Sequence, residues 1–295
     1  MRHLGEHTIY KSVEGKQKLQ YAYEQYLETF SLSFERKWVD TRFGPTHTLM
    51  TGPANGKPLI ILQGGNCLNP MTLSWFEPLW SQYRIYAPDT IGHPGFSAET
   101  RISAKDDSFA KWIEDIMHAF QLQSSAFVGP SYGGGIILRL AAYAPEKIAC
   151  AVLVSPAGVK LGSKLDMIRY ILLPLIRYRS TSSPVSLQRI ADVMSASSMS
   201  EQDKQIIGDI FQHVKLEQDM PKLTKRKELD SYKAPTMLLA GRDDIFFPGE
   251  RLLSAASRII PSLTISKSYE SGHFPSSQVR TQMNTDIKEF LSIHY

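Results

Sequence analysis

The sequence predicts an α/β protein, with a mostly parallel sheet flanked by helices and an inserted helical cap. Short, continuously apolar runs alternate with amphipathic helices, which is typical of parallel strands buried on both faces. One long segment breaks this alternation and shows only helical spacing. The 295 residues are 42% hydrophobic and 21% charged, the composition of a globular protein with a large core.

The N-terminal part is expected to contain a helix and a hairpin ahead of the main sheet. Apolar residues such as Leu19 and Tyr23 recur at helical spacing within residues 14–29, which predicts a helix laid across the main body. Residues 37–41 and 46–51 resemble two strands separated by a short turn-forming segment. We therefore expect a hairpin beside the parallel strands.

The predicted sheet consists of short apolar runs separated by helices. Repeated strand, helix, strand units imply parallel pairing through right-handed crossovers, with helices on both faces. Apolar residues from Phe109 to Phe120 fall on one helical face, and a second helix is expected over residues 133–143. The predicted buried strands cover residues 59–62, 84–87, 126–128, 148–154 and 236–240, and a further strand is expected at 263–266.

The segment that breaks the alternation is interpreted as an all-helical cap. We assign residues 157–232 to this cap, and residues 1–156 and 233–295 to the core. The cap follows the strand at 148–154, so it is expected to overhang the carboxyl edge of the sheet, where open α/β sheets bind ligands. Its apolar positions include Ile168, Ile171, Leu172 and Leu175, then Ile206, Ile207, Ile210 and Phe211.

The charge pattern favours no nucleic-acid partner. The chain has 33 Lys and Arg against 29 Asp and Glu, a net charge of +4, and its basic residues are scattered. The densest basic group, Lys222, Lys225, Arg226 and Lys227, is followed by Glu228. We interpret this group as a solvated helix end or linker.

Nothing in the sequence predicts secretion or a membrane span. The first eighteen residues are polar, and the most apolar stretch, residues 165–178, contains charges and falls short of a bilayer-spanning length. Two cysteines, Cys67 and Cys150, are too few for a disulfide scaffold. We therefore expect reduced thiols and a cytoplasmic location, while the oligomeric state stays open.

A serine lies in a G-x-S-x-G motif between a predicted strand and a predicted helix. In this turn the serine adopts a strained conformation that lifts its hydroxyl above the sheet, and glycines two residues before and after avoid a clash. Gly129-Pro130-Ser131-Tyr132-Gly133 fits this pattern, and an apolar strand ends at Gly129. Ser131 is therefore the candidate nucleophile, and the alternative is a structural turn with an inert serine.

A serine hydroxyl needs a base to remove its proton, and the base needs an acid to orient it. Of the eight histidines, only His93 and His273 lie in loops of the predicted core. The others fall at the termini (His3, His7 and His294), in the hairpin (His47), in a helix (His118) or in the cap (His213). Asp243 and Asp244, just after the strand at 236–240, are the candidate acids.

Two backbone regions could stabilise an oxyanion. The helix that starts near Tyr132 directs free N–H groups toward Ser131. The loop after the first parallel strand, Gln63-Gly64-Gly65-Asn66, could add a second donor from Gly65 or Asn66. The alternative for this loop is a plain tight turn.

From about Phe43 to Tyr295 the sequence resembles the α/β-hydrolase superfamily, and most closely its capped bacterial carboxylesterases. The motifs that carry the resemblance are Gln63-Gly64-Gly65, residues 89–97, the turn at Ser131, Gly241 with Asp244 and Pro248, and Gly272-His273-Phe274. Gln63 and Pro130 depart from the residues that the family usually has at these positions. Asp89 is expected to hold the turn at residues 92–97.

The resemblance implies a catalytic triad in the chain order Ser, Asp, His. This order favours His273 over His93, and the family spacing from Gly241 and to Pro248 favours Asp244 over Asp243. The expected enzyme is a carboxylic ester hydrolase that uses Ser131, His273 and Asp244, with N–H groups of Tyr132 and of Gly65 or Asn66 as oxyanion donors.

Other activities remain compatible with these residues. The alternatives are a hydrolase of carbon–carbon or amide bonds with the same triad, and a ligand-binding relative without turnover. Relatives that act on haloalkanes or epoxides have Asp in place of Ser131. No metal or other cofactor is expected, because no cluster of His, Cys, Asp and Glu has metal-ligand spacing.

Overall fold

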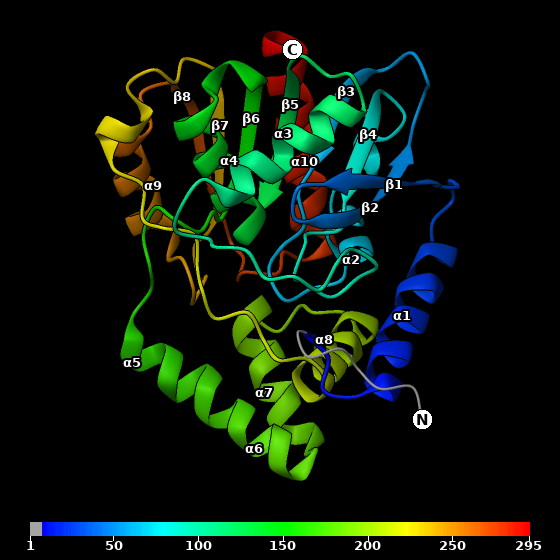
Figure 1. The fold of residues 1–295 in the computed structure, drawn as a ribbon. Coiled ribbons are helices and arrows are strands. Elements are labelled where there is room, and N and C mark those ends of the chain that lie inside the picture. Colours follow the sequence, from blue (N-terminus) through cyan, green and yellow to red (C-terminus); the bar gives the residue numbers. More distant parts are fainter. Residues whose placement is uncertain (1–7) are drawn as a thin grey trace.

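The computed structural model describes residues 8–295, which form an eight-stranded sheet with helices on both faces (Figure 1). The strand order is β1-β2-β4-β3-β5-β6-β7-β8. The strand β2 pairs antiparallel with β1 and with β4, and all strands from β3 to β8 are parallel to one another. This confirms the predicted α/β class. The strands are β1 Glu35–Thr41, β2 Gly44–Thr51, β3 Lys57–Ile61, β4 Tyr83–Pro88, β5 Ser125–Pro130, β6 Ile148–Val154, β7 Thr236–Gly241 and β8 Leu263–Tyr269.

The helices bury the two faces of the sheet in two separate cores. Side chains alternate along β5, so Phe127 packs in one core while Val128 packs in the other. Trp112 of α3 and Leu140 of α4 lie with Phe127, and Phe290 of α10 lies with Val128. The helices outside the inserted segment are α1 Val13–Glu28, α2 Asn69–Leu73, α3 Ser108–Ala119, α4 Tyr132–Tyr143, α9 Gly249–Ile259 and α10 Ser277–His294, with short 3₁₀ turns at Glu77–Leu79 and Pro145–Lys147. A third 3₁₀ turn, Arg226–Leu229, lies at the end of the inserted segment.

The predicted helix over residues 14–29 is α1. The Ser12 side chain accepts a hydrogen bond from Gly15 N and caps the start of the helix. A Cβ on Gly15 would lie 2.7 Å from the His213 side chain, so this glycine allows α1 to pack closely against α8. In Figure 1, α1 runs beside α8 rather than over the sheet.

The predicted hairpin is present, but its turn is shorter than expected. Arg42 and Phe43 alone form the turn, while Gly44 already pairs with Thr41 and Pro45 with Asp40. A proline near the start of a strand is tolerated because it removes a donor only at the strand end.

The inserted segment contains four helical elements and a π-helical stretch, and it lies at the carboxyl end of the parallel strands (Figure 1). Its first three elements are continuous in sequence, so residues 164–181 form one long helix with a π-helical interior. The chain then returns to β7 through a mostly non-helical stretch. The elements are α5 Lys164–Asp166, the π-helix Met167–Leu172, α6 Leu173–Thr181, α7 Pro184–Ser195 and α8 Glu201–His213.

In the basic group at the end of the inserted segment, Arg226 and Lys227 begin a short 3₁₀ turn. Burial opposes ionisation of Glu228, but hydrogen bonds from Lys222, the Lys225 N–H and Arg139 outweigh it and lower the Glu228 pKa to about 2. Arg139 is buried, so Glu228 also balances a charge inside the fold. Part of this basic group therefore has a structural role.

Between residues 8 and 295, no helix combines the length and the apolar character needed to cross a bilayer. Cys67 and Cys150 are both buried and unbonded to each other. Burial raises the pKa of each thiol to about 12, so both thiols stay protonated at neutral pH.

Candidate active site

Ser131 lies between the last residue of β5 and the first residue of α4. Its φ of 51° and ψ of −115° fall in a region that L-residues rarely adopt. Neighbouring backbone holds this conformation: Ser131 N donates to Val154 O at 2.8 Å, and Ala157 N donates to Ser131 O at 2.9 Å. The end of β6 and the first residues of the inserted segment thus lock the turn.

Both glycines of the motif are required by close contacts, for different reasons. A Cβ on Gly129 would lie 2.6 Å from the backbone of Gly133, which is the clash expected from the sequence. A Cβ on Gly133 would instead lie 2.6 Å from the carbonyl oxygen of Leu62, just beyond β3. Gly133 therefore also makes room for the neighbouring strand.

His273 is hydrogen-bonded to Asp244 across 29 residues of sequence. The His273 Nδ1 lies 2.7 Å from Asp244 Oδ2, and the other oxygen, Oδ1, accepts from Phe246 N at 2.8 Å and Phe247 N at 3.0 Å. The carboxylate is fully buried, and the His273 side chain is 10% exposed. With Nδ1 engaged, the Nε2 atom is left for proton transfer.

Asp243 points away from this pair. It is exposed, whereas Asp244 is 2% exposed. A Cβ on Gly241 would lie 2.5 Å from the carbonyl oxygens of Ser271 and Gly272, so a glycine at the end of β7 lets the His273 loop approach. The geometry therefore brings Asp244, and not Asp243, to His273.

Within residues 8–295, the backbone N–H groups of Gly65, Asn66 and Tyr132 make no hydrogen bond. A Cβ on Gly65 would lie 3.0 Å from the Tyr132 Cβ, so the two loops are in direct contact. Tyr132 is also the first residue of α4, where unpaired N–H groups and the helix dipole favour negative charge.

Hydrogen bonds of the Gln63 side chain hold the loop that contains Gly65 and Asn66. Gln63 Nε2 donates to the carbonyl oxygens of Cys67 and Pro94, and Gln63 Oε1 accepts from Thr90 N at 2.8 Å. Gln63, which departs from the family pattern, thus still ties this loop to the turn after β4.

Asn66 connects the same loop to the inserted segment. Its Nδ2 donates to Glu217 O at 3.0 Å, and its Oδ1 accepts from Glu217 N at 2.8 Å. Its φ of 50° is in the left-handed region, where Asn is enriched among non-glycine residues. The Asn66 side chain therefore ties its loop to the backbone of Glu217, which lies in the last part of the inserted segment.

Asp89 holds the turn after β4, in agreement with its expected structural role. Its Oδ2 accepts from Phe96 N at 2.8 Å, and its Oδ1 accepts from the Tyr23 hydroxyl at 2.7 Å. A Cβ on Gly95 would lie 2.7 Å from the same carboxylate. Asp89 is therefore fully occupied and faces no ligand cavity.

Ser131 and His273 line one cavity of about 190 Å³, together with Gly65, Asn66 and Tyr132. Most other lining side chains are apolar, and none of the described residues in its wall is Asp, Glu, Lys or Arg. This volume is below the range of roughly 300–1,000 Å³ found for drug-sized ligands. The cavity therefore suits a small, uncharged group beside the serine.

The inserted helices form one wall of this cavity. Ile171, Leu175, Met194, Ile207 and Phe211 line it. Ile168 and Leu172, two of the apolar positions of the predicted cap, are each 46% exposed on the outer side. Arg169, Arg177 and Arg179 are also exposed.

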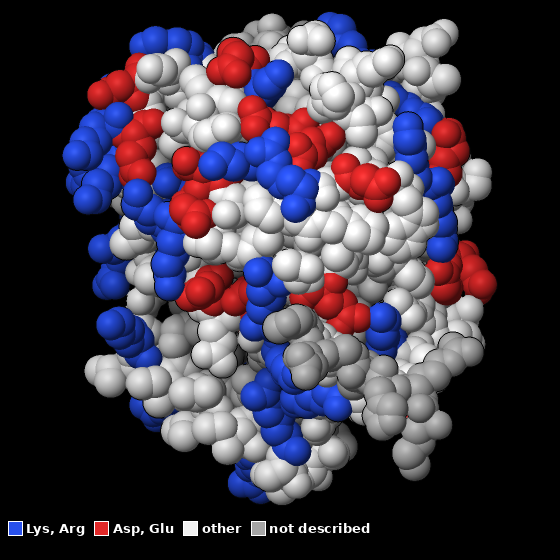
Figure 2. All heavy atoms as spheres, viewed as in Figure 1, with Lys and Arg blue, Asp and Glu red and all other residues white. Residues whose placement is uncertain are grey.

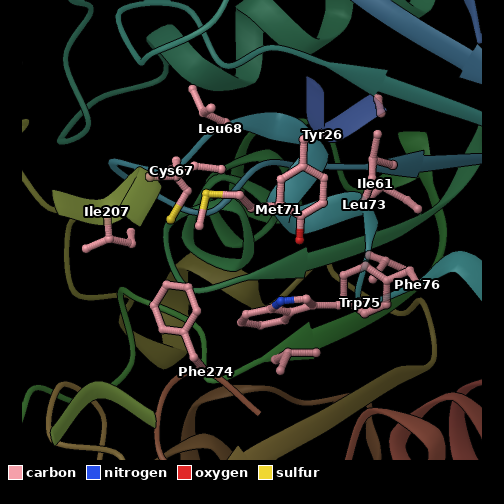
Figure 3. Packing of buried hydrophobic residues seen from close by; sticks show 14 of the residues in the cluster. Tyr26, Ile61, Cys67, Leu68, Met71, Leu73, Trp75, Phe76, Ile207 and Phe274 are labelled. Carbon is pink, nitrogen blue, oxygen red and sulfur yellow. The ribbon is translucent and has the colours of Figure 1, made fainter. Parts of the chain in front are cut away.

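The opposite wall contains residues that the sequence analysis missed. Met71 and Trp75 come from α2 and the turn after it, and Trp75 packs edge-on against Phe274 with ring centroids 5.5 Å apart. Figure 3 shows these three side chains and Ile207 around a common space. Because α2 has only five residues, it shows no helical period, and the proline at its start was the only local signal.

Of the other histidines that the structure describes, none is part of this wall. His93 is buried against the Tyr132 ring, with centroids 4.7 Å apart, and burial lowers its pKa to about 4. It does not line the cavity. His3 and His7 lie outside the described residues. Within residues 8–295, no group of three or more His, Cys, Asp and Glu is placed to hold a metal ion.

Comparisons with known proteins agree with this fold. A family model described as the alpha/beta hydrolase fold matches residues 57–277. Carboxylesterase YbfK of Bacillus subtilis is 26% identical over 96% of both chains, and an uncharacterized carboxylesterase of the same organism, nap, is 25% identical over 92% of both. The crystal structure of the naproxen esterase from Bacillus subtilis superposes with a TM-score of 0.82 at 21% identity, covering 95% of this chain and 99% of the other.

Proposed function

This chain belongs to the α/β-hydrolase family, and on that premise we propose that it hydrolyses carboxylic esters with Ser131 as nucleophile, His273 as base and Asp244 as orienting acid. The full-length relatives reported above are carboxylesterases by name, at about a quarter identity. They support ester hydrolysis over cleavage of carbon–carbon or amide bonds by the same residues.

The observation that carries this proposal is the placement of Ser131 and His273 in one apolar cavity, with His273 bonded to a buried carboxylate. A strained serine, an oriented imidazole and free N–H groups are the parts that acyl transfer requires. A ligand-binding relative without turnover would need none of this arrangement.

The proposed reaction has two stages. Ser131 Oγ bonds to the ester carbonyl carbon while His273 Nε2 takes the hydroxyl proton, and Gly65 or Asn66 N–H and Tyr132 N–H stabilise the oxyanion. Collapse of this intermediate breaks the ester C–O bond, and the departing alcohol takes the proton from His273. Water then repeats the sequence on the acyl-enzyme and releases the acid.

The division of the chain follows from the same proposal. We propose that residues 8–156 and 233–295 form the hydrolase core and that residues 157–232 form a cap that supplies one wall of the acyl site. Residues 1–7 of the predicted core lie outside the described residues. The cytoplasmic location expected from the sequence stays a prediction.

Covalent labelling tests the proposal directly. A fluorophosphonate probe is expected to label the native protein once, at Ser131, and to leave Ser131→Ala unlabelled. A parallel turnover screen over esters, thioesters, amides and diketones is expected to favour esters. Absence of labelling in the folded native protein would support the non-catalytic alternative.

The acyl preference is expected to follow the size of the cavity. With a series of neutral p-nitrophenyl esters, kcat/KM should be highest for short and medium acyl chains, because the cavity is small and uncharged. Ile171→Trp should shift the optimum toward acetate, since the larger ring fills the acyl site. The measurement is kcat/KM against chain length.

The matched control is Ile168→Trp, on the outer side of the same helix, which should leave the chain-length profile unchanged. Rapid turnover of esters with anionic acyl groups, without activity on neutral ones, would contradict the proposal that the cavity binds a small, uncharged acyl group.

Asn66 is expected to be a positioning residue for the oxyanion loop. Asn66→Ala removes both hydrogen bonds to Glu217, so the loop loses its link to the cap, and kcat should fall roughly tenfold with little change in KM. Glu217→Ala is the control, because Asn66 bonds only to the Glu217 backbone. An equal loss of kcat in Asn66→Ala and Glu217→Ala would contradict a positioning role of the two hydrogen bonds that the Asn66 side chain makes.

A further inference from the structure

Large apolar side chains are concentrated on the surface of the inserted segment. Of the fourteen exposed large hydrophobic side chains among the described residues, eight lie between residues 161 and 185. Six of them, each 46–78% exposed, form what we call the outer stripe: Leu161, Leu165, Ile168, Leu172, Leu173 and Ile176. Clusters of this kind on a protein surface mark interaction sites.

Apart from Leu161, which precedes it, the outer stripe lies on the helix over residues 164–181. Leu165, Ile168, Leu172 and Ile176 are separated by three or four residues, so they lie along a single side. Ile171, on the other side of the same helix, lines the active-site cavity. One helix therefore separates the cavity from an apolar outer surface.

Basic residues flank the outer stripe. Between residues 160 and 189 there are six Lys and Arg, all exposed, against one acidic residue, Asp166. In Figure 2, the lower edge of the molecule, where Figure 1 places α5 and α6, shows uncharged and basic side chains and no acidic ones. The basic residues are Lys160, Lys164, Arg169, Arg177, Arg179 and Arg189.

We propose that the outer stripe and these basic residues dock on an anionic lipid surface. A helix with an apolar side and flanking Lys and Arg has the features of interfacial helices, since the apolar side chains enter the acyl layer while the cations meet lipid phosphates. A second copy of the chain fits less well, because a two-fold contact would place the same cationic surface against itself.

Docking in this way brings the active-site cavity next to the lipid layer. Esters dissolved in that layer would then reach Ser131 past the helix that carries Ile171 and Leu175. This consequence rests on the proposed ester hydrolysis, whereas the docking itself does not depend on it.

Vesicle sedimentation tests the docking separately from catalysis. Full-length Ser131→Ala protein, which cannot consume the lipid, is mixed with phosphatidylcholine vesicles that contain about a quarter phosphatidylglycerol, or none. We expect binding to the anionic vesicles, weak binding to the neutral ones, and loss of binding as salt rises from about 0.1 M to 1 M. Adding Leu165→Glu and Leu173→Glu should weaken binding roughly tenfold or more.

The matched control carries Tyr21→Glu and Ile293→Glu instead, since these two side chains are each 66% exposed and lie outside the inserted segment. This control should bind like the parent. In an otherwise native chain, Leu165→Glu with Leu173→Glu should leave turnover of a small soluble ester unchanged. Three results would overturn the proposal. The first is equal binding to anionic and neutral vesicles, and the second is an equal loss of vesicle binding in the Leu165→Glu/Leu173→Glu variant and in the control. The third is self-association, without any vesicle binding, that Leu165→Glu with Leu173→Glu abolishes.

Discussion

Ser131→Ala and His273→Ala are each expected to lower ester turnover by roughly a million-fold, because nucleophile and base act as a unit and either loss removes the covalent route. Both variants should remain folded. Ser131 is held in its turn by backbone hydrogen bonds, which an alanine keeps, and the His273 ring makes one side-chain hydrogen bond, to Asp244. The measurements are kcat with one soluble ester and thermal unfolding of each variant.

His93→Ala is the control for this prediction. The His93 ring is buried against Tyr132 and does not line the cavity, and its lowered pKa keeps it neutral near pH 7. The His93→Ala substitution leaves a cavity in the core, so it should lower the free energy of unfolding. It should have little effect on ester turnover. An inactive but folded His93→Ala beside a nearly normal His273→Ala would show that the wrong histidine had been assigned.

Asp244→Asn is expected to lower turnover by about four orders of magnitude. An amide at this position accepts no comparable bond from the protonated Nδ1, so His273 loses its tautomer control and the stabilisation of its imidazolium form. The hydrogen bonds from Phe246 N and Phe247 N to Oδ1 can persist, so the loop should keep its shape. The measurement is kcat near neutral pH.

Asp243→Asn provides a neighbour of the same chemistry that is exposed and makes no contact with His273. Its turnover should be nearly normal. The reverse ranking of the two folded variants would move the acid to Asp243 and leave Ser131 and His273 in place.

Features encoded by short stretches of sequence could be predicted from the sequence itself. The apolar run 148–154 coincides with β6, because a strand buried on both faces needs apolar residues at every position. The sequence Gly129-Pro130-Ser131-Tyr132-Gly133 indicated the turn because the close contact of Gly129 with Gly133 joins residues only four apart. The long insertion was recognisable because helical spacing replaced buried strands.

Relations between distant segments were decided only by the tertiary structure. The contact of His273 with Asp244 rather than Asp243 depends on how Gly241 lets two loops approach, and the wall formed by Met71 and Trp75 depends on a helix too short to show a period. The sequence could propose the acid only by analogy with a family spacing.

The long helix of the inserted segment, residues 164–181, shows most clearly what the sequence could not predict. It is apolar on both sides, so its composition could not tell which residues face the cavity. The π-helical stretch Met167–Leu172 also changes the angle between successive side chains. By itself the sequence determined that this segment is helical and rich in apolar residues. Packing against the core decided that Ile171 and Leu175 turn inward and that Ile168 and Leu172 turn outward, because side-chain direction depends on contacts far away in the chain.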